Sequence, residues 1–214
     1  MPPGTYPQYQ ISELERIARQ LLEERFSEGV SIPVDIDYLA ESEPGVSLDI
    51  MLGLRHMFGI AGAVVVHPEE RRFTILIDQS VADGNAAFYR FTLAEEFSHL
   101  VLHRSILEQI KTVKDAARLH ASPDYYDHLD RNAKWLASAL LMPERCLRED
   151  SSTLFTRLRA VIHDEQTLVY KLTIRLAQRY NVSQVAMSHR LRNWPLNIYE
   201  AIHQAFVGGL SSLL

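Results

Sequence analysis

The chain has 214 residues, of which 47% are hydrophobic and 23% are charged, and its formal net charge is −5. These proportions are those of an ordinary globular protein and exclude a disordered chain, while the negative charge argues against a protein that coats nucleic acid over its whole surface. The single cysteine, Cys146, excludes an intrachain disulfide. No apolar run approaches the ~20 residues of a membrane helix, and the N-terminus lacks the features of a secretion signal. We therefore expect a cytoplasmic protein with no membrane partner.

Two helices are predicted ahead of the first strand. Apolar residues recur with helical spacing over residues 11–26, and Gly29 ends this helix. Pro33 opens the segment PVDIDYLAES, which we interpret as a short second helix that ends near Gly45.

A small sheet is predicted next. Three short segments rich in β-branched residues are bounded by Gly, His-Pro or Asp-Gly, and they read VSLDIML, GIAGAVVVH and RFTILID. The segment HPEERR (67–72) separates the second from the third and has the composition of a turn. We expect the three segments to form one antiparallel sheet.

From Ala86 onward the pattern is helical. Helices are predicted over residues 86–103 and 124–142, two or three times within 150–193, and over 196–206. The order helix–helix–strands–helices predicts an α+β protein that is mainly helical. We expect a main domain over residues 1–150 and a helical C-terminal segment over residues 151–214.

The segment RFTLAEEFSHLVLH (90–103) places ionisable residues on one predicted helix. Glu95 and His99 are four residues apart, which puts them ~40° apart around the helix and ~6 Å apart along it, so both can reach one metal ion. A zinc motif of this spacing has His at both positions and a Glu after the first His that acts as general base; Glu96 holds that base position here. Glu95 in place of the first His still offers a carboxylate, but it makes the ligand set less favourable for zinc.

The alternative interpretation is an acidic helix face that is exposed to water, which is common. The apolar residues around the motif, among them Phe91, Leu93 and Phe97, instead indicate a largely buried helix. Because an unpaired buried charge is costly, we expect the ionisable groups of this helix to meet partners or a cation.

Two motifs together carry a family resemblance. RFTLAEEFSHLVLH and the predicted helix LDRNAKWLASALLMP (129–143) resemble the two signature helices of the ImmA/IrrE family of metallopeptidases. PVDIDYLAE and LAQRYNVSQVAMSHRL are similar to further segments of that family, so the resemblance covers about residues 11–194. It implies a zincin-like helix pair, a bound zinc ion and proteolysis of a helix-turn-helix repressor.

Carried over by position, the resemblance makes Glu96 the catalytic base and His99 the second zinc ligand. Glu95 then stands where the family has its first zinc histidine, and Asn132 stands where the family has the glutamate that is its third ligand. Because a neutral amide oxygen binds zinc poorly, two of the three ligands are changed for the worse. We expect zinc to bind weakly or not at all, with Glu95 hydrogen-bonded to His99 instead.

Two other ligand sets remain open at this stage. His128 lies four residues before Asn132 on the same helix face and is an alternative third ligand. If Asp130 and Asn132 join the two motif residues instead, the set is rich in oxygen and favours manganese or magnesium over zinc.

The segment 171–194 contains five Lys/Arg and no Asp/Glu. It is predicted to form two helices joined at Asn181, which tolerates a left-handed turn, and Ser183, which caps the second helix. This spacing suits a helix-turn-helix that contacts DNA or a DNA-binding partner; the alternative is a packed helix pair with a solvated basic surface. The residues of the second helix that we expect to be exposed and to make the contact are Gln184, Ser188, His189, Arg190 and Arg192.

The altered ligands favour one function over two others. We expect a non-catalytic relative of the family that binds a protein partner and acts in transcriptional or stress regulation. The alternatives are an active zinc-dependent endopeptidase that cleaves a helix-turn-helix repressor, and a hydrolase that uses manganese or magnesium. The first is favoured because even changes outside the ligand set of a zinc site lower its metal affinity about 10–100-fold.

Overall fold

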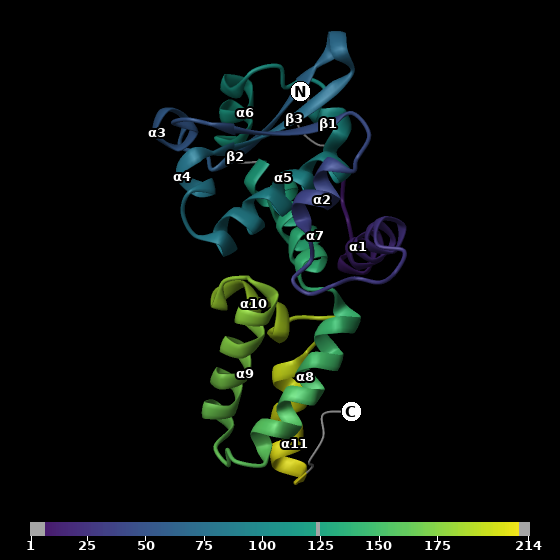
Figure 1. Cartoon of the computed structure of the whole chain (residues 1–214), viewed down its shortest axis with the longest axis vertical. Coiled ribbons are helices and arrows are strands. Elements are labelled where there is room, and N and C mark those ends of the chain that lie inside the picture. The colour runs from purple at the N-terminus through teal and green to yellow at the C-terminus, as the bar shows by residue number, and fades with distance from the viewer. Residues whose placement is uncertain (1–6, 123–124, 210–214) are drawn as a thin grey trace. The chain divides into compact units, whose positions relative to one another are not determined.

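The computed structural model describes residues 7–122 and 125–209, with only the backbone of residues 125–127. Two compact units are present (Figure 1): the first runs to Leu140 apart from Ile32–Val34, and the second comprises Ile32–Val34 and the chain from Leu141 onward. The boundary predicted from the sequence lies at residue 150.

The first unit begins with two helices, as the sequence predicts. The helix α1 (Ile11–Arg25) has its first turn closed by the Glu13 carboxylate, which accepts a hydrogen bond from the Gln10 N–H at 2.7 Å. The helix α2 (Ile36–Glu41) is capped by Asp35, whose carboxylate accepts from the Tyr38 N–H at 3.0 Å.

The sheet has three strands in the order β1-β3-β2, and these are β1 (Val46–Met51), β2 (Gly62–His67) and β3 (Arg72–Asp78). The pair β2–β3 is antiparallel, whereas β1 and β3 are parallel. The prediction of a wholly antiparallel sheet is therefore wrong for β1. The chain leaves β1 through a short helix, α3 (Leu54–Phe58), and enters β2 at the opposite edge of the sheet, so that β3 returns between them.

A long buried helix, α5 (Ala86–Leu107), follows the short α4 (Gln79–Ala82). Asn85 caps α5 by accepting the Phe88 N–H at 3.1 Å. The helix packs against β2 and β3 and against α2 (Figure 1), which confirms that it is buried. Its backbone departs from helical geometry at His103, where φ is −126° and ψ is 25°.

The first unit is completed by helical segments that return to α5. The helix α6 (Val113–His120) packs against β2, and η2 (Tyr125–Asp130) is a turn of π-helix that contacts both α5 and α6. It leads into α7 (Arg131–Leu141). The single predicted helix over 124–142 is thus a π-helical turn followed by an α-helix, a combination that often occurs at functional sites.

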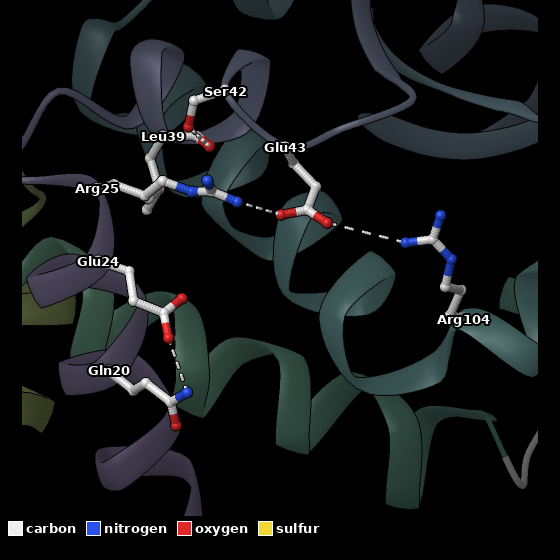
Figure 2. A network of polar contacts seen from close by, with 7 residues as sticks. All are labelled: Gln20, Glu24, Arg25, Leu39, Ser42, Glu43 and Arg104. Atoms are coloured by element: carbon white, nitrogen blue, oxygen red, sulfur yellow. Dashed lines mark hydrogen bonds and ion pairs between the residues drawn. The ribbon is translucent and has the colours of Figure 1, made fainter.

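A polar network joins distant parts of the first unit (Figure 2). The Glu43 carboxylate accepts a hydrogen bond from Arg25 at 2.9 Å and lies 3.9 Å from a guanidinium nitrogen of Arg104. The Arg104 guanidinium also lies over the Phe73 ring, 4.8 Å from its centroid. These contacts tie the end of α1 and the segment after α2 to the C-terminal part of α5, although partly exposed ion pairs stabilise only modestly.

The second unit is helical and consists of α8 (Glu144–Arg159), α9 (Glu165–Tyr180), α10 (Gln184–Arg192) and α11 (Ile198–Gly208). The helix α9 packs against α8, α10 and α11. The predicted turn is confirmed at two residues: Asn181 is left-handed, with φ of 49°, and Ser183 accepts the Ala186 N–H at 3.1 Å. Within the described ranges of the chain, no helix is long and apolar enough to cross a membrane.

Candidate functional site

The acidic residues and the first histidine of the α5 motif, Glu95, Glu96 and His99, are largely shielded from solvent. Glu96 and His99 are 5% and 2% exposed, and the Glu95 side chain is 19% exposed. The acidic face is therefore not solvated, and the alternative interpretation of an exposed helix face is excluded.

Glu95, His99 and Asp130 converge in space. One potential ligand atom from each lies within 4.8 Å of the others, and Asp130 reaches this position from the end of η2. The family resemblance implied Asn132 as the third ligand. Asn132 follows Asp130 by two residues, and residues two apart on a helix are rotated ~200° from each other, so the two side chains point in different directions. The Asn132 amide donates instead to the Pro7 carbonyl at 3.4 Å.

His128 does not belong to this group in the part of the chain that the structure describes. Its Nδ1 lies 3.4 Å from Nε2 of Gln8 in an exposed setting. The structure therefore brings together Glu95 and His99, as expected, and with them Asp130, which the oxygen-rich alternative ligand set included, but not Asn132.

Lys134 supplies positive charge to the two carboxylates. Its Nζ lies 2.7 Å from Asp130 Oδ2 and 3.8 Å from Glu95 Oε1, and it comes from α7 one helical turn after Asp130. Burial, then the charge of Glu96 and a hydrogen bond with Asp130, raise the pKa of Glu95 well above its usual value, while Lys134 opposes this shift. The hydrogen bond between the two carboxyl groups requires a proton on one of them.

Glu96 packs against the first residue of β2. A Cβ atom at Gly62 would lie 2.7 Å from Glu96 Cγ, so only a glycine leaves room for the Glu96 side chain in this place. Burial, and then the charge of Asp130, raise the pKa of Glu96 to about 8. Glu96 is therefore protonated at neutral pH, unlike a solvated glutamate.

Two further histidines surround His99. His103 lies at the distortion of α5, and its Nδ1 is 3.1 Å from Nδ1 of His99, while the His120 ring centroid lies 6.5 Å from that of His99. Burial, then the charges of His103, His120 and Lys134, lower the pKa of His99 well below its usual value. Burial lowers the pKa of His103 to about 4. Both imidazoles are therefore neutral near pH 7.

A small pocket adjoins this group and reaches the edge of the sheet. Val64, Glu96, His99 and His120 are among its lining residues. The antiparallel register points the peptide groups of Gly62, Val64 and Val66 away from β3, and the Val66 N–H donates to the Ile110 carbonyl at 2.8 Å. The outer edge of β2 thus presents main-chain groups beside the pocket.

The residues predicted for contact with DNA or a partner divide into two sets. Gln184, His189 and Arg192 are exposed, whereas Ser188 is half-buried and accepts a hydrogen bond from the Tyr199 hydroxyl at 3.3 Å. The prediction that Arg190 is exposed is wrong. Its side chain is buried at 3% exposure and its Nε donates to the Met142 carbonyl at 3.1 Å, because this α10 position faces the interior of the second unit.

Sequence reasoning missed three residues of the site. The spacing of Lys134 four residues after Asp130 is an ion-pair signal that could have identified it. His120 lies between the helices predicted over 86–103 and 124–142. Gly62 could not be identified from its neighbours in sequence, because it is required by the Glu96 side chain on another element.

Comparison with known protein families identifies one family for this chain. The family of the IrrE N-terminal-like domain matches residues 74–192, which is more than half of the chain and includes α5, η2 and α7. The chain belongs to this family. The IrrE-like chain is also similar in fold to a Mycobacterium tuberculosis transcriptional regulator, with 17% identity, a TM-score of 0.49, and coverage of 86% of this chain and 48% of that one. It thus spans about half the length of that regulator, and no curated protein matches it in sequence.

The IrrE-like family implies zinc, and the residues present fit zinc poorly. Glu95, His99 and Asp130 offer one imidazole and two carboxylates, an oxygen-rich set that suits manganese or magnesium better. In addition, any cation that binds both carboxylates must displace the Lys134 ammonium, which already contacts Asp130 at 2.7 Å and lies 3.8 Å from Glu95.

The raised pKa of Glu96 predicts a pH-dependent effect of Glu96→Gln. Because the folded pKa is about 8 and the ordinary value is 4.5, the folded state retains a proton that the unfolded state loses, so this residue destabilises the fold as pH rises between these values. Glutamine lacks this titration. The melting temperature of Glu96→Gln minus that of wild type, both measured in chelator, should therefore increase as the pH rises from about 5 to about 8.

The matched control is Glu23→Gln on the exposed surface of α1, which makes the same substitution away from the site. The lowered pKa values of His99 and His103 destabilise both proteins equally in acid, so they cancel in the comparison. An equal gap between Glu96→Gln and wild type at both pH values would contradict this description of Glu96.

Proposed function

We propose that this IrrE-like chain is a non-proteolytic regulator that binds a segment of a protein partner in the cytoplasm and acts in transcriptional or stress regulation. The observation that carries the proposal is the Lys134 ammonium, 2.7 Å from Asp130 and 3.8 Å from Glu95. The two carboxylates that would bind a metal ion have a resident partner from the chain itself. In this proposal zinc binds weakly or not at all.

The charges of the site support a metal-free state. A buried pair of carboxylates repels itself unless a proton or a cation lies between them. Here a shared hydrogen bond and the Lys134 ammonium together meet that requirement for Glu95 and Asp130. In this metal-free state Glu96 is protonated near neutral pH, so the ionised base that peptide hydrolysis needs is not available.

Partner binding is supported by the edge of β2. Gly62 and Val64 direct their peptide groups away from β3, beside a small pocket that Val64, His99 and His120 line, although both residues are buried here and α6 packs against the strand. An extended peptide would add to this edge through main-chain hydrogen bonds once the covering segment moves aside. We propose that the partner is a helix-turn-helix repressor, as the family resemblance implies, and that it is bound without being cut.

The second unit supplies a candidate surface for DNA. Of the five basic residues in 171–194, Lys171, Arg175 and Arg192 are exposed, while Arg179 pairs with Asp150 at 2.6 Å and Arg190 is buried. Three exposed cations with Gln184 and His189 nearby in sequence support weak, phosphate-directed contact rather than recognition of a defined base sequence.

A metal-dependent endopeptidase is the second candidate. The observation that favours it is the convergence of Glu95, His99 and Asp130 within 4.8 Å, with Glu96 buried next to them in the position of a general base. In this alternative the residues would hold a manganese or magnesium ion, or zinc, and the chain would cleave the repressor.

Metal content separates the two candidates. Wild-type protein purified without chelator from zinc-supplemented cells should contain far less than one equivalent of zinc or manganese by elemental analysis. Glu95→His, which restores a second imidazole, should raise the zinc content, and Glu24→His on the exposed face of α1 should not. Near one equivalent of metal in the wild type, together with cleavage of a helix-turn-helix repressor that Glu96→Gln abolishes, would establish the endopeptidase instead.

Contact with DNA predicts binding that depends on salt. A fluorescent non-specific duplex should bind the protein and lose affinity between about 50 and about 200 mM salt, and Arg175→Ala should reduce the slope of this dependence by about one. Arg145→Ala in α8 is the matched control, because its side chain is 90% exposed and lies outside α9 and α10. Absence of binding, or an equal loss in both variants, would rule out this surface.

A further inference from the structure

The Lys134 ammonium contacts the two carboxylates that a metal ion at this site would bind. Nζ lies 2.7 Å from Asp130 Oδ2 and 3.8 Å from Glu95 Oε1, while one potential ligand atom each of Glu95, His99 and Asp130 lies within 4.8 Å of the others. Separations this short leave no room for a second cation beside the ammonium without strong repulsion between them.

The Lys134 side chain is able to leave. It is 44% exposed and lies on α7, so it can rotate into solvent without opening the core. Its absence would leave Asp130 at 8% and Glu95 at 19% side-chain exposure, facing each other without their cation. Two largely buried carboxylates that face each other attract a divalent cation that can bind both of them.

The remaining ligand is already oriented. The hydrogen bond of 3.1 Å between Nδ1 of His99 and Nδ1 of His103 holds the His99 ring, and hydrogen bonds of this type fix metal-binding imidazoles in other proteins.

We propose that Lys134 is a built-in competitor that keeps an otherwise complete divalent-cation site, made by Glu95, His99 and Asp130, closed to metal. The proposal rests on the non-catalytic function proposed above, and it names Lys134 as the group that maintains the metal-free state. The oxygen-rich set identifies the excluded ligand as a hard divalent cation, with manganese as its representative. The chain has therefore kept its metal ligands in altered form and has placed its own ammonium group against the two carboxylates.

The test is a manganese titration of Lys134→Met, which removes the charge and keeps most of the apolar stem. Calorimetry at about pH 7.5 should give one site, with affinity about tenfold or more above that of wild type. Manganese should also raise the melting temperature of Lys134→Met but not that of wild type, because a ligand that binds only the folded state stabilises it.

Three further variants complete the design. Lys134→Arg keeps the positive charge and should behave as wild type, as should Lys114→Met, an exposed lysine of α6 in the same unit. Lys134→Met/Asp130→Asn should lose the gained site. If Lys134→Met is unfolded without metal, refolding on addition of manganese, read by circular dichroism, counts as binding.

The outcomes are distinguishable from those of the proposed function. If neither wild type nor Lys134→Met binds manganese, or if the gain persists in Lys134→Met/Asp130→Asn, the competitor proposal is wrong while the non-catalytic function stands. If wild type already binds one equivalent as tightly as Lys134→Met, the competitor proposal is wrong, and cleavage of a repressor decides the non-catalytic function separately.

Discussion

The ion pair of Lys134 with Asp130, extended to Glu95, is the interaction on which the character of this site depends. It joins α7 and η2 to α5 at a place where the carboxyl groups of Asp130 and Glu95 would otherwise lie close together without a positive charge. Removing one partner from such a group leaves an uncompensated charge, which is more costly than the pair is favourable. The same contact determines whether the carboxylates are open to a metal ion.

The surrounding fold is arranged so that the buried helix can carry these groups. Gly62 gives the Glu96 side chain its space against β2, and the departure from helical geometry at His103 coincides with the hydrogen bond that holds His99. The π-helical turn before α7 brings Asp130, rather than Asn132, to the same side as Glu95. A zincin-like helix pair is thus retained with a different set of charges between its members.

The sequence predicted the parts of this structure that local pattern determines. The periodicity of α1 and α5 and the motif in α5 gave the helices, the burial and two members of the site, Glu95 and His99. The parallel pairing of β1 with β3 could not be found this way, since it depends on a crossover through the short α3. Asn132 was carried over by position from the family motif, and a match of positions does not reveal the π-helical turn that places Asp130 beside Glu95 instead. The burial of Arg190 was missed for a related reason: a charged residue is expected at the surface unless a backbone carbonyl such as that of Met142 receives it.

The most direct test of the metal-free site is a crystal structure of the wild-type protein grown in manganese, with anomalous diffraction measured to locate the ion. The account predicts no anomalous peak between Glu95, His99 and Asp130, and density that places the Lys134 ammonium against both carboxylates. A strong peak among these three side chains, with Lys134 turned toward solvent, would contradict it.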